Sequence, residues 1–145
     1  MRAPLLAGKI LGCLDNSFTV AEWSDAGAPP GVPPGRPRHI APRHVHHNDD
    51  EAWYVLEGTL CVQSGDEQIE VPAGSGLLVT RGTPHTYWNP GPGPVRYLLV
   101  MPPAILRLIQ EIHAMPDRNP AALAAVFERN GSSLLDPPPG LGGGV

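Results

Sequence analysis

The stretch HVHHNDDEAWYVLEG, residues 44–58, limits the fold of this chain more than any other part of the sequence. His44 and His46 are two residues apart, so in an extended strand their side chains point to the same face. Glu51 follows after one asparagine and two aspartates, residue types that favour a bend. A bend there would bring the carboxylate to the point where the two imidazoles converge. We therefore predict that these three side chains meet at one site.

A second histidine motif, GTPHTYWN, occupies residues 82–89. Its glycine and proline mark a turn immediately before His85. Three imidazoles and one carboxylate would then be available to one divalent metal ion. Nitrogen and oxygen ligands of this kind suit Fe, Mn, Ni, Cu or Zn in the divalent state. The predicted metal ligands are His44, His46, Glu51 and His85.

The two stretches resemble the paired motifs of the cupin superfamily, whose members are small β-barrels that usually hold one metal ion. The first family motif has two histidines separated by one residue, a glutamate three or four residues later and a glycine after six more. His44, His46, Glu51 and Gly58 meet this pattern. The shorter spacing that the family allows would make Asp50 the carboxylate ligand. Glu51 is preferred because six residues then separate it from Gly58.

The second family motif combines a glycine, a proline-x-glycine turn, a histidine and an asparagine. Gly74, Gly82, His85 and Asn89 meet it, while Thr80 stands where the proline is usual. The resemblance implies an all-β fold, an antiparallel double-stranded β-helix or jelly-roll barrel. Small cupins similar to this chain include quercetin dioxygenase-like proteins, isomerases, cyclases, lyases and sensors, and a shared fold does not choose among these functions.

Alternating polar and apolar residues place the barrel at residues 17–101, as short strands separated by glycine-containing turns. Within it, residues 27–42 are rich in proline, which lacks the backbone donor that a central strand needs. We expect a surface loop there, and a lid over the barrel mouth is the alternative. Residues 1–16 are expected to form a short arm or an edge strand.

Residues 102–131 are expected to form a helical C-terminal extension. Apolar residues recur at helical spacing from Ile105 to Ile112. A second helix is expected to begin at Asn119, a good N-terminal cap, and to end at the asparagine–glycine pair that follows. The two helices are expected to pack on the outside of the barrel or to seal one end of it. Residues 132–145 are expected to be disordered.

Three further side chains are predicted to line a substrate pocket beside the metal. Trp53 shares a strand face with Glu51, and Tyr87 and Asn89 share a face with His85. For the aromatic residues, simple filling of the core is the alternative.

The other histidines are not expected to bind the metal. His47 has the opposite strand parity to the two ligands before it, so it should face away from them. His39 is also expected to be a non-ligand, and His113 falls in a helical pattern and is expected on the surface.

Composition excludes several classes of protein. The net charge is only −4 and no basic run is present, so nucleic acid is not an expected partner. No apolar run approaches the ~18 residues that a membrane span needs. Cys13 and Cys61 fit no metal or redox spacing, and a disulfide between them is not expected. We expect a cytoplasmic protein that binds a small molecule.

The predicted function is that of a metal-dependent dioxygenase acting on a small enolic or phenolic molecule, with Glu51 as the candidate catalytic residue. Two alternatives stay open. One is a non-oxidative isomerase or cyclase that uses the ion as a Lewis acid, and the other is a binding or sensing protein without turnover. We also expect a homodimer, because small barrels with exposed edges often bury them by pairing, and the N-terminal arm is a candidate for exchange.

Overall fold

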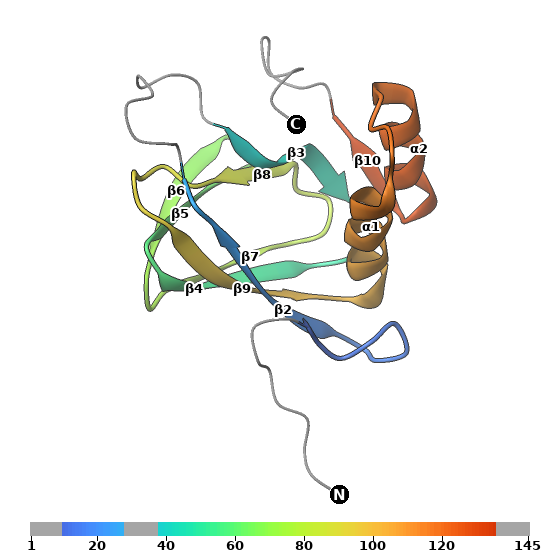
Figure 1. The fold of residues 1–145 in the computed structure, drawn as a ribbon. Coiled ribbons are helices and arrows are strands. Elements are labelled where there is room, and N and C mark those ends of the chain that lie inside the picture. Colours follow the sequence, from blue (N-terminus) through green and yellow to red (C-terminus); the bar gives the residue numbers. More distant parts are fainter. Residues whose placement is uncertain (1–9, 28–37, 136–145) are drawn as a thin grey trace, which may run out of the picture.

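Two five-stranded antiparallel sheets and two helices make up the computed structural model, which describes residues 10–27 and 38–135 (Figure 1). The strands are β1 (Ile10–Leu11), β2 (Thr19–Asp25), β3 (His39–His46), β4 (Glu51–Glu57), β5 (Thr59–Ser64), β6 (Glu67–Pro72), β7 (Gly76–Val79), β8 (His85–Trp88), β9 (Val95–Met101) and β10 (Ser132–Leu134). The helices are α1 (Pro103–Ala114) and α2 (Pro120–Arg129). The all-β prediction with two C-terminal helices is confirmed.

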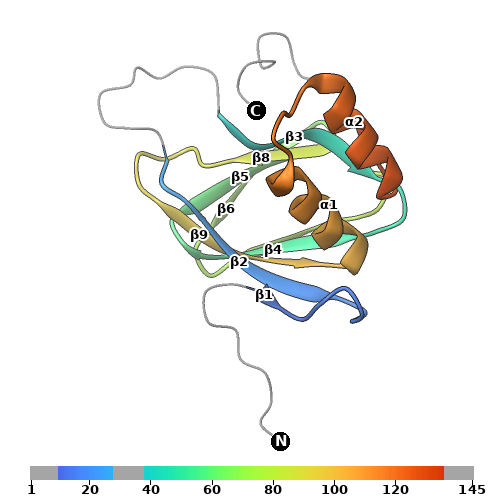
Figure 2. The ribbon, with the colours of Figure 1, turned by 45° about the vertical axis from the view of Figure 1, so that its right-hand side comes forward.

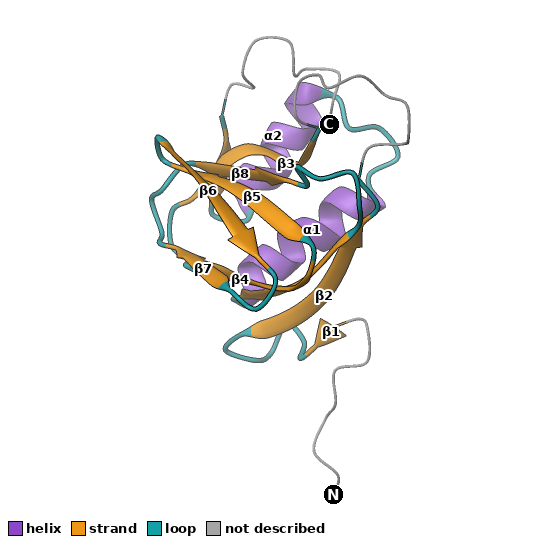
Figure 3. Ribbon diagram, turned by 90° about the vertical axis from the view of Figure 1, so that its left-hand side faces the viewer, coloured by secondary structure: helices purple, strands orange, loops and turns teal. Residues whose placement is uncertain are grey.

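The order of strands in each sheet is that of a jelly-roll, because neighbours come from distant parts of the chain. One sheet has the order β1-β2-β9-β4-β7 and the other β10-β3-β8-β5-β6. Thr19 of β2, for example, pairs with Met101 of β9. The sheets face each other and enclose the main core (Figure 3).

Strand β4 shows how alternation places side chains relative to this core. Glu51, Trp53 and Val55 are buried on the inner face, whereas Tyr54 is 45% exposed on the outer face. The predicted sharing of faces along this strand is therefore confirmed. The strand thus places the carboxylate of Glu51, its first residue, in the interior of the barrel.

Gly58 makes the tight turn between β4 and β5. Its backbone has a φ of 76°, in the left-handed region that glycine adopts at little cost. A Cβ atom at this position would collide with the backbone carbonyl oxygen of Pro94. The family glycine thus allows a close approach between two backbones.

The proline-rich loop is shorter than predicted. It was expected to run to residue 42, but β3 begins at His39 and contains Pro42. The pairing of β3 with β8 shifts register on both sides of Ala41, and β10 pairs only with residues from His44 onward. Because the ladder is irregular here, the missing donor of Pro42 is tolerated. The lid was suggested for the whole loop 27–42, and residues 28–37 of it lie outside the described residues.

The helices begin where their sequences predict. Pro103 occupies the first turn of α1, and the Asn119 side chain caps α2 by accepting a hydrogen bond from the Ala122 backbone at 2.9 Å. The helices were expected on the outside of the barrel or at one end of it. They lie at one open end, where α1 crosses between the two sheets (Figure 2). None of the helices in the described ranges is long and apolar enough to cross a membrane.

The disordered tail was predicted to begin at residue 132, and this boundary is too early. Ser132 to Leu134 form β10, which pairs with β3 and places Ser132 opposite His46. Composition could not reveal this pairing, because the partner strand lies more than eighty residues earlier in the chain. Residues 136–145 lie outside the described residues. At the other terminus, Ile10 and Leu11 form the edge strand that was one of the two expectations for residues 1–16.

Candidate metal centre

Four buried side chains from three strands converge inside the barrel. His44 and His46 lie on β3, Glu51 opens β4 and His85 opens β8. His44 and His85 are cross-strand partners, so the pairing of β3 with β8 brings the two motifs together. One ligand atom from each of the four lies within 4.8 Å of every other. These are the four residues that the sequence predicts.

The outer nitrogen of each imidazole is held by a neighbour. His44 Nδ1 donates to the carbonyl oxygen of Pro42 at 2.6 Å, and His85 Nδ1 donates to that of Thr83 at 2.9 Å. His46 Nδ1 lies 2.6 Å from the Ser132 hydroxyl. A carbonyl oxygen can only accept, so His44 and His85, when neutral, carry their free lone pair on Nε2.

The Nε2 atoms of the three imidazoles point at one another and at the carboxylate. His44 Nε2 is 3.2 Å from His46 Nε2, and Glu51 Oε1 is 3.2 Å from His46 Nε2 and 2.6 Å from His85 Nε2. Acceptors this close repel each other unless a cation, a proton or a metal ion, lies between them. Imidazoles anchored at the outer nitrogen are also typical of metal ligands. The donor set therefore fits one divalent ion.

Burial and mutual charge tune the ionisation of the cluster. Burial, together with the neighbouring His85 and His46, lowers the pKa of His44 to about 3, so this imidazole stays neutral at pH 7. Burial alone would raise the pKa of Glu51. In the metal-free protein, where a proton takes the place of the cation, hydrogen bonds from His46 and His85 outweigh burial and hold that pKa well below its ordinary value, which keeps the carboxylate ionised. Neutral imidazoles and an ionised carboxylate are the forms that bind metal.

Glu51, and not Asp50, is the carboxylate of the cluster. The Asp50 side chain points outward and accepts hydrogen bonds from Arg81, including one from its backbone at 2.8 Å. These bonds lower the pKa of Asp50. The structure thus decides between the two spacings that the family motif allows.

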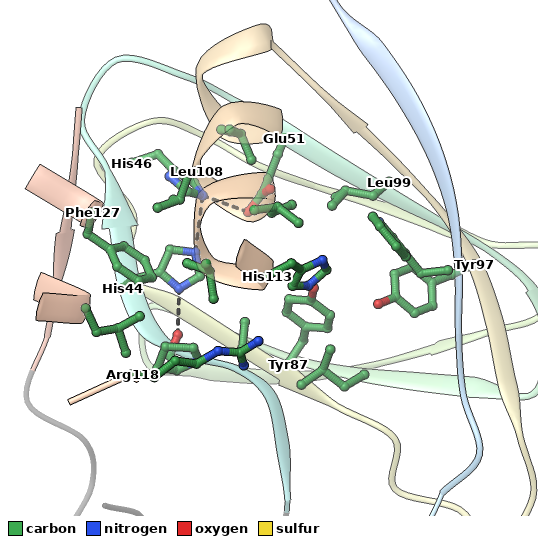
Figure 4. Close-up of a pocket in the computed structure, with 18 of the residues that line it drawn as sticks. His44, His46, Glu51, Tyr87, Tyr97, Leu99, Leu108, His113, Arg118 and Phe127 are labelled. Carbon is green, nitrogen blue, oxygen red and sulfur yellow. Dashed lines mark hydrogen bonds and ion pairs between the residues drawn. The ribbon is translucent and has the colours of Figure 1, made fainter. Parts of the chain in front are cut away.

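The cluster opens into a cavity of about 320 Å³ between the sheets and the helices (Figure 4). Its walls are mostly apolar, and His44, His46 and Glu51 line it together with the inner face of α1. Phe127 of α2 packs against His44, with ring centroids 5.3 Å apart. The helical extension therefore forms part of the site as well as sealing the barrel.

The three predicted pocket residues have different positions. Tyr87 lines the cavity, and burial, with the charge of Glu51 adding to it, raises the pKa of Tyr87, so its hydroxyl remains protonated. Trp53 is not among the lining residues. It is buried behind the site, with its ring 5.8 Å from His85 and 5.2 Å from Tyr87, and so fills the core.

Asn89 also lies away from the cavity. Its amide donates to the backbone carbonyls of Asp25 and Gly93, and its oxygen accepts from the backbone of Gly91. It therefore stabilises the turn after β8, and its predicted place in the pocket is wrong. The strand ends at Trp88, so the alternation of faces no longer applies at the next residue.

The remaining histidines lie outside the cluster, as predicted. His39 stacks on Trp88 at 5.1 Å, and His47 is exposed, with its Nε2 2.7 Å from the Ser133 hydroxyl. His113 is exposed at the cavity mouth, edge-on to Trp23 at 5.8 Å. The prediction of an ordinary surface residue therefore missed its place beside the site.

The sequence analysis also missed Ser132 and Arg118, because each reaches the site only through tertiary contacts.

The two cysteines are both free: Cys13 is exposed and Cys61 is buried.

A barrel of two antiparallel sheets around a buried cluster of three histidines and one carboxylate defines a class of jelly-roll proteins with an interior site. Residues 32–101 match the family model described as the Cupin domain. The chain therefore contains a Cupin domain, which spans just under half of its 145 residues.

Several known proteins are similar to this chain in sequence or in fold. Tetracenomycin polyketide synthase protein TcmJ of Streptomyces glaucescens is 31% identical over 87 residues, which cover 59% of this chain and 58% of that protein. The chain thus matches less than two thirds of the length of this relative. A cupin protein from Bacteroides fragilis has a similar fold, with a TM-score of 0.53, 15% identity and coverage of 70% of this chain and 82% of that chain. A cupin-2 domain protein from Shewanella frigidimarina has a TM-score of 0.47 and 21% identity, over 60% of this chain and 72% of that chain.

Proposed function

We propose that this cupin is a metal-dependent enzyme, a dioxygenase that acts on a small enolic or phenolic molecule. The observation that carries the proposal is the opening of the His₃Glu cluster into a mainly apolar cavity of about 320 Å³. This volume lies at the lower end of the range typical of small-molecule sites, ~300–1,000 Å³. Such a cavity suits a molecule of one or two rings that presents an oxygen to the cluster.

Four protein ligands would hold one divalent ion and leave coordination positions open toward the cavity. A bound ion would supply Lewis acidity to an enolate or phenolate oxygen and, if redox-active, reactivity toward O₂. Apolar residues of α1 and α2 line the same cavity and would shield the ion from water. Tyr87, protonated and lining the cavity, is a hydrogen-bond donor for a substrate oxygen.

Glu51 is the proposed catalytic residue. It is the one carboxylate that lines the cavity among the described residues, and it is ionised. A carboxylate that leaves the ion can accept a proton from an enol or phenol, so proton transfer would follow substrate binding. The alternative is that Glu51 serves only as a ligand that offsets charge.

The substrate class is supported by one relative. The protein from S. glaucescens is named for a polyketide synthase, and polyketides carry enolisable ketones and phenols. These groups also undergo isomerisation and ring closure without oxygen. The same observation therefore favours a second candidate, a non-oxidative isomerase or cyclase in which the ion acts as a Lewis acid.

Metal analysis of the purified protein is the first test. We expect about one divalent ion per chain, lost in His46→Ala and in His85→Ala because each variant removes a ligand nitrogen. His47→Ala is the matched control, since His47 lies next to the cluster in sequence but is exposed and points away. A ratio unchanged in the first two variants would overturn the metal site.

Turnover of a panel of enols and phenols, with and without O₂, is the second test. Oxygen uptake in step with substrate loss is the result expected of a dioxygenase. Product formation under strict anaerobiosis would instead establish the isomerase or cyclase. Substrate binding without turnover under either condition would leave a binding or sensing protein.

A further inference from the structure

The mouth of the cavity carries a positive side chain that the proposed reaction does not use. Arg118 lies in the loop between α1 and α2 and is the one lining residue with a permanent positive charge. Figure 4 shows its guanidinium group directed toward the space that the labelled residues surround. His113, at the end of α1, lines the same mouth.

Arg118 has no carboxylate partner within the described part of the chain. Its neighbour Asp117 is instead 3.5 Å from the amide of Asn119. Four other arginines are neutralised by ion pairs on the surface: Arg38 with Asp25, Arg81 with Asp50, Arg96 with Glu22 and Glu57, and Arg129 with Glu111. The guanidinium at the cavity mouth is therefore available to a ligand.

An apolar stretch separates the two polar ends of the cavity. Ile105, Leu108, Ile109 and Ile112 form one face of α1 and line this stretch. Leu108 belongs to the same apolar cluster as Phe127, which packs against His44. From Leu108 to His113 the helix rises about 7–8 Å. That length corresponds to one aromatic ring with a short side chain.

We propose that the substrate carries a carboxylate at the end remote from its metal-binding oxygen, and that Arg118 binds this carboxylate beside His113. The planar guanidinium presents paired donors that match a carboxylate, and Arg118 is exposed at the cavity mouth, where a ligand can reach it. The inference rests on the proposed function for the position of the other end of the substrate. It narrows the substrate class to enolic or phenolic acids.

Two probes of the same shape test the carboxylate subsite. One is 3-(3,4-dihydroxyphenyl)propanoate, whose catechol oxygens bind a divalent ion, and the other is its uncharged amide. Both are titrated by calorimetry into the Zn-loaded protein, so that no redox reaction intervenes. The wild-type protein is expected to bind the acid about 10-fold more tightly than the amide, as one charge-assisted contact provides.

Arg118→Gln is expected to remove this preference without changing the affinity for the amide. Arg107→Gln is the matched control: Arg107 is exposed on α1, forms no ion pair within the described ranges and does not line the cavity. It should keep the preference in full. An equal preference for the acid in wild type and Arg118→Gln, with unchanged metal content and thermal unfolding, would overturn the subsite.

A metal-independent probe separates this inference from the proposed function. 3-Phenylpropanoate has the carboxylate but no oxygen for the ion, and its binding to the metal-free protein is followed by NMR. Binding that weakens about 10-fold in Arg118→Gln and not in Arg107→Gln supports the subsite even where both catechol probes fail to bind. That combination of results would refute the proposal of a phenolic substrate but not the carboxylate subsite. Absence of any Arg118-dependent binding, with the amide still bound to the Zn-loaded protein, would refute the subsite alone.

Discussion

At the residue scale, His44 shows how burial controls the chemistry of the cluster. Its Nδ1 is committed to the Pro42 carbonyl, so Nε2 is the only nitrogen left to bind a cation. In the metal-free protein its pKa is about 3, against an ordinary value of 6.5. At a pH between these two values, His44 is therefore neutral in the folded protein and protonated in the unfolded chain.

This difference predicts how stability depends on pH. Between pH 6.5 and 4.5 the unfolded state binds a proton on residue 44 and the folded state does not, so the free energy of unfolding falls as the pH falls. The His44 contribution is at most about 1.4 kcal/mol per pH unit. Glu51 adds a slope of the same sign only near the lower end of this window, because its ordinary pKa of 4.5 leaves the unfolded state partly protonated there while its folded pKa lies lower.

Urea unfolding of the metal-free protein at three values of pH across this window measures the slope. The His44→Gln variant cannot take up the proton in either state, so its slope should be shallower than that of the wild type. Equal slopes for the two proteins would contradict the assignment to His44.

The role of Glu51 can be separated into charge and basicity. Glu51→Gln keeps the size of the side chain and one oxygen but loses the proton-accepting carboxylate. If Glu51 is a base, the variant should still bind metal and substrate, with turnover reduced by about 10²–10⁴-fold. Metal content and turnover measured on one preparation decide the point. A parallel fall of both would make Glu51 a ligand and nothing more.

Gly58 offers a test of the barrel itself. Gly58→Ala forces a side chain into left-handed backbone and against the Pro94 carbonyl, so we expect a loss of at least about 2 kcal/mol in the free energy of unfolding. Gly65→Ala is the control, because Gly65 has a φ of 59° with nothing within 4 Å of the added Cβ. Chemical denaturation of the two variants should show the larger loss for Gly58. Equal losses would mean that the Pro94 contact is relieved cheaply.

At the element scale, the short strand β10 connects the helical extension to the metal centre. It pairs with β3 so that Ser132, which is 1% exposed, meets the outer nitrogen of His46. A hydroxyl in that position fixes the orientation of the ring and leaves Nε2 toward the cluster. The strand therefore orients a ligand from a part of the chain that contains no ligand.

Removal of this contact should weaken metal binding. We expect Ser132→Ala to lower the affinity for Zn by about 10–100-fold, the usual effect of losing a partner of a metal-bound imidazole. Ser133→Ala is the control, since the Ser133 hydroxyl contacts His47 and Glu128 on the surface. Competition with a chromophoric chelator measures both affinities. Equal affinities in the two variants would show that Ser132 does not support His46.

At the scale of the whole molecule, the homodimer remains a prediction. The outer face of β4 and β7 exposes Tyr54 and Leu78, at 45% and 59%, which is apolar surface that a second copy could cover. Residues 1–9 of the arm suggested for exchange lie outside the described residues. Sedimentation equilibrium at micromolar concentration should give twice the chain mass. A monomer under these conditions would refute the dimer.

The sequence alone predicted the parts of the site that depend on local geometry. His44 and His46 share a face because of strand alternation, and Glu51 follows the bend after them. The cap at Asn119 is equally local, because the side chain and the backbone donor are three residues apart. The turn before His85 indicated the fourth ligand, and the family motif added the barrel.

Tertiary structure decided everything that depends on contacts between distant segments. Ser132 meets His46 across 86 positions of sequence, and no local pattern signals such a pairing. Trp53 points into the barrel but fills the core rather than lining the cavity. The packing of the adjoining strands determines which of the inward-pointing side chains border the cavity. Nothing in the sequence around Arg118 distinguishes it from any other surface arginine. Only the packing of α1 and α2 over the barrel places its charge at the mouth of the site.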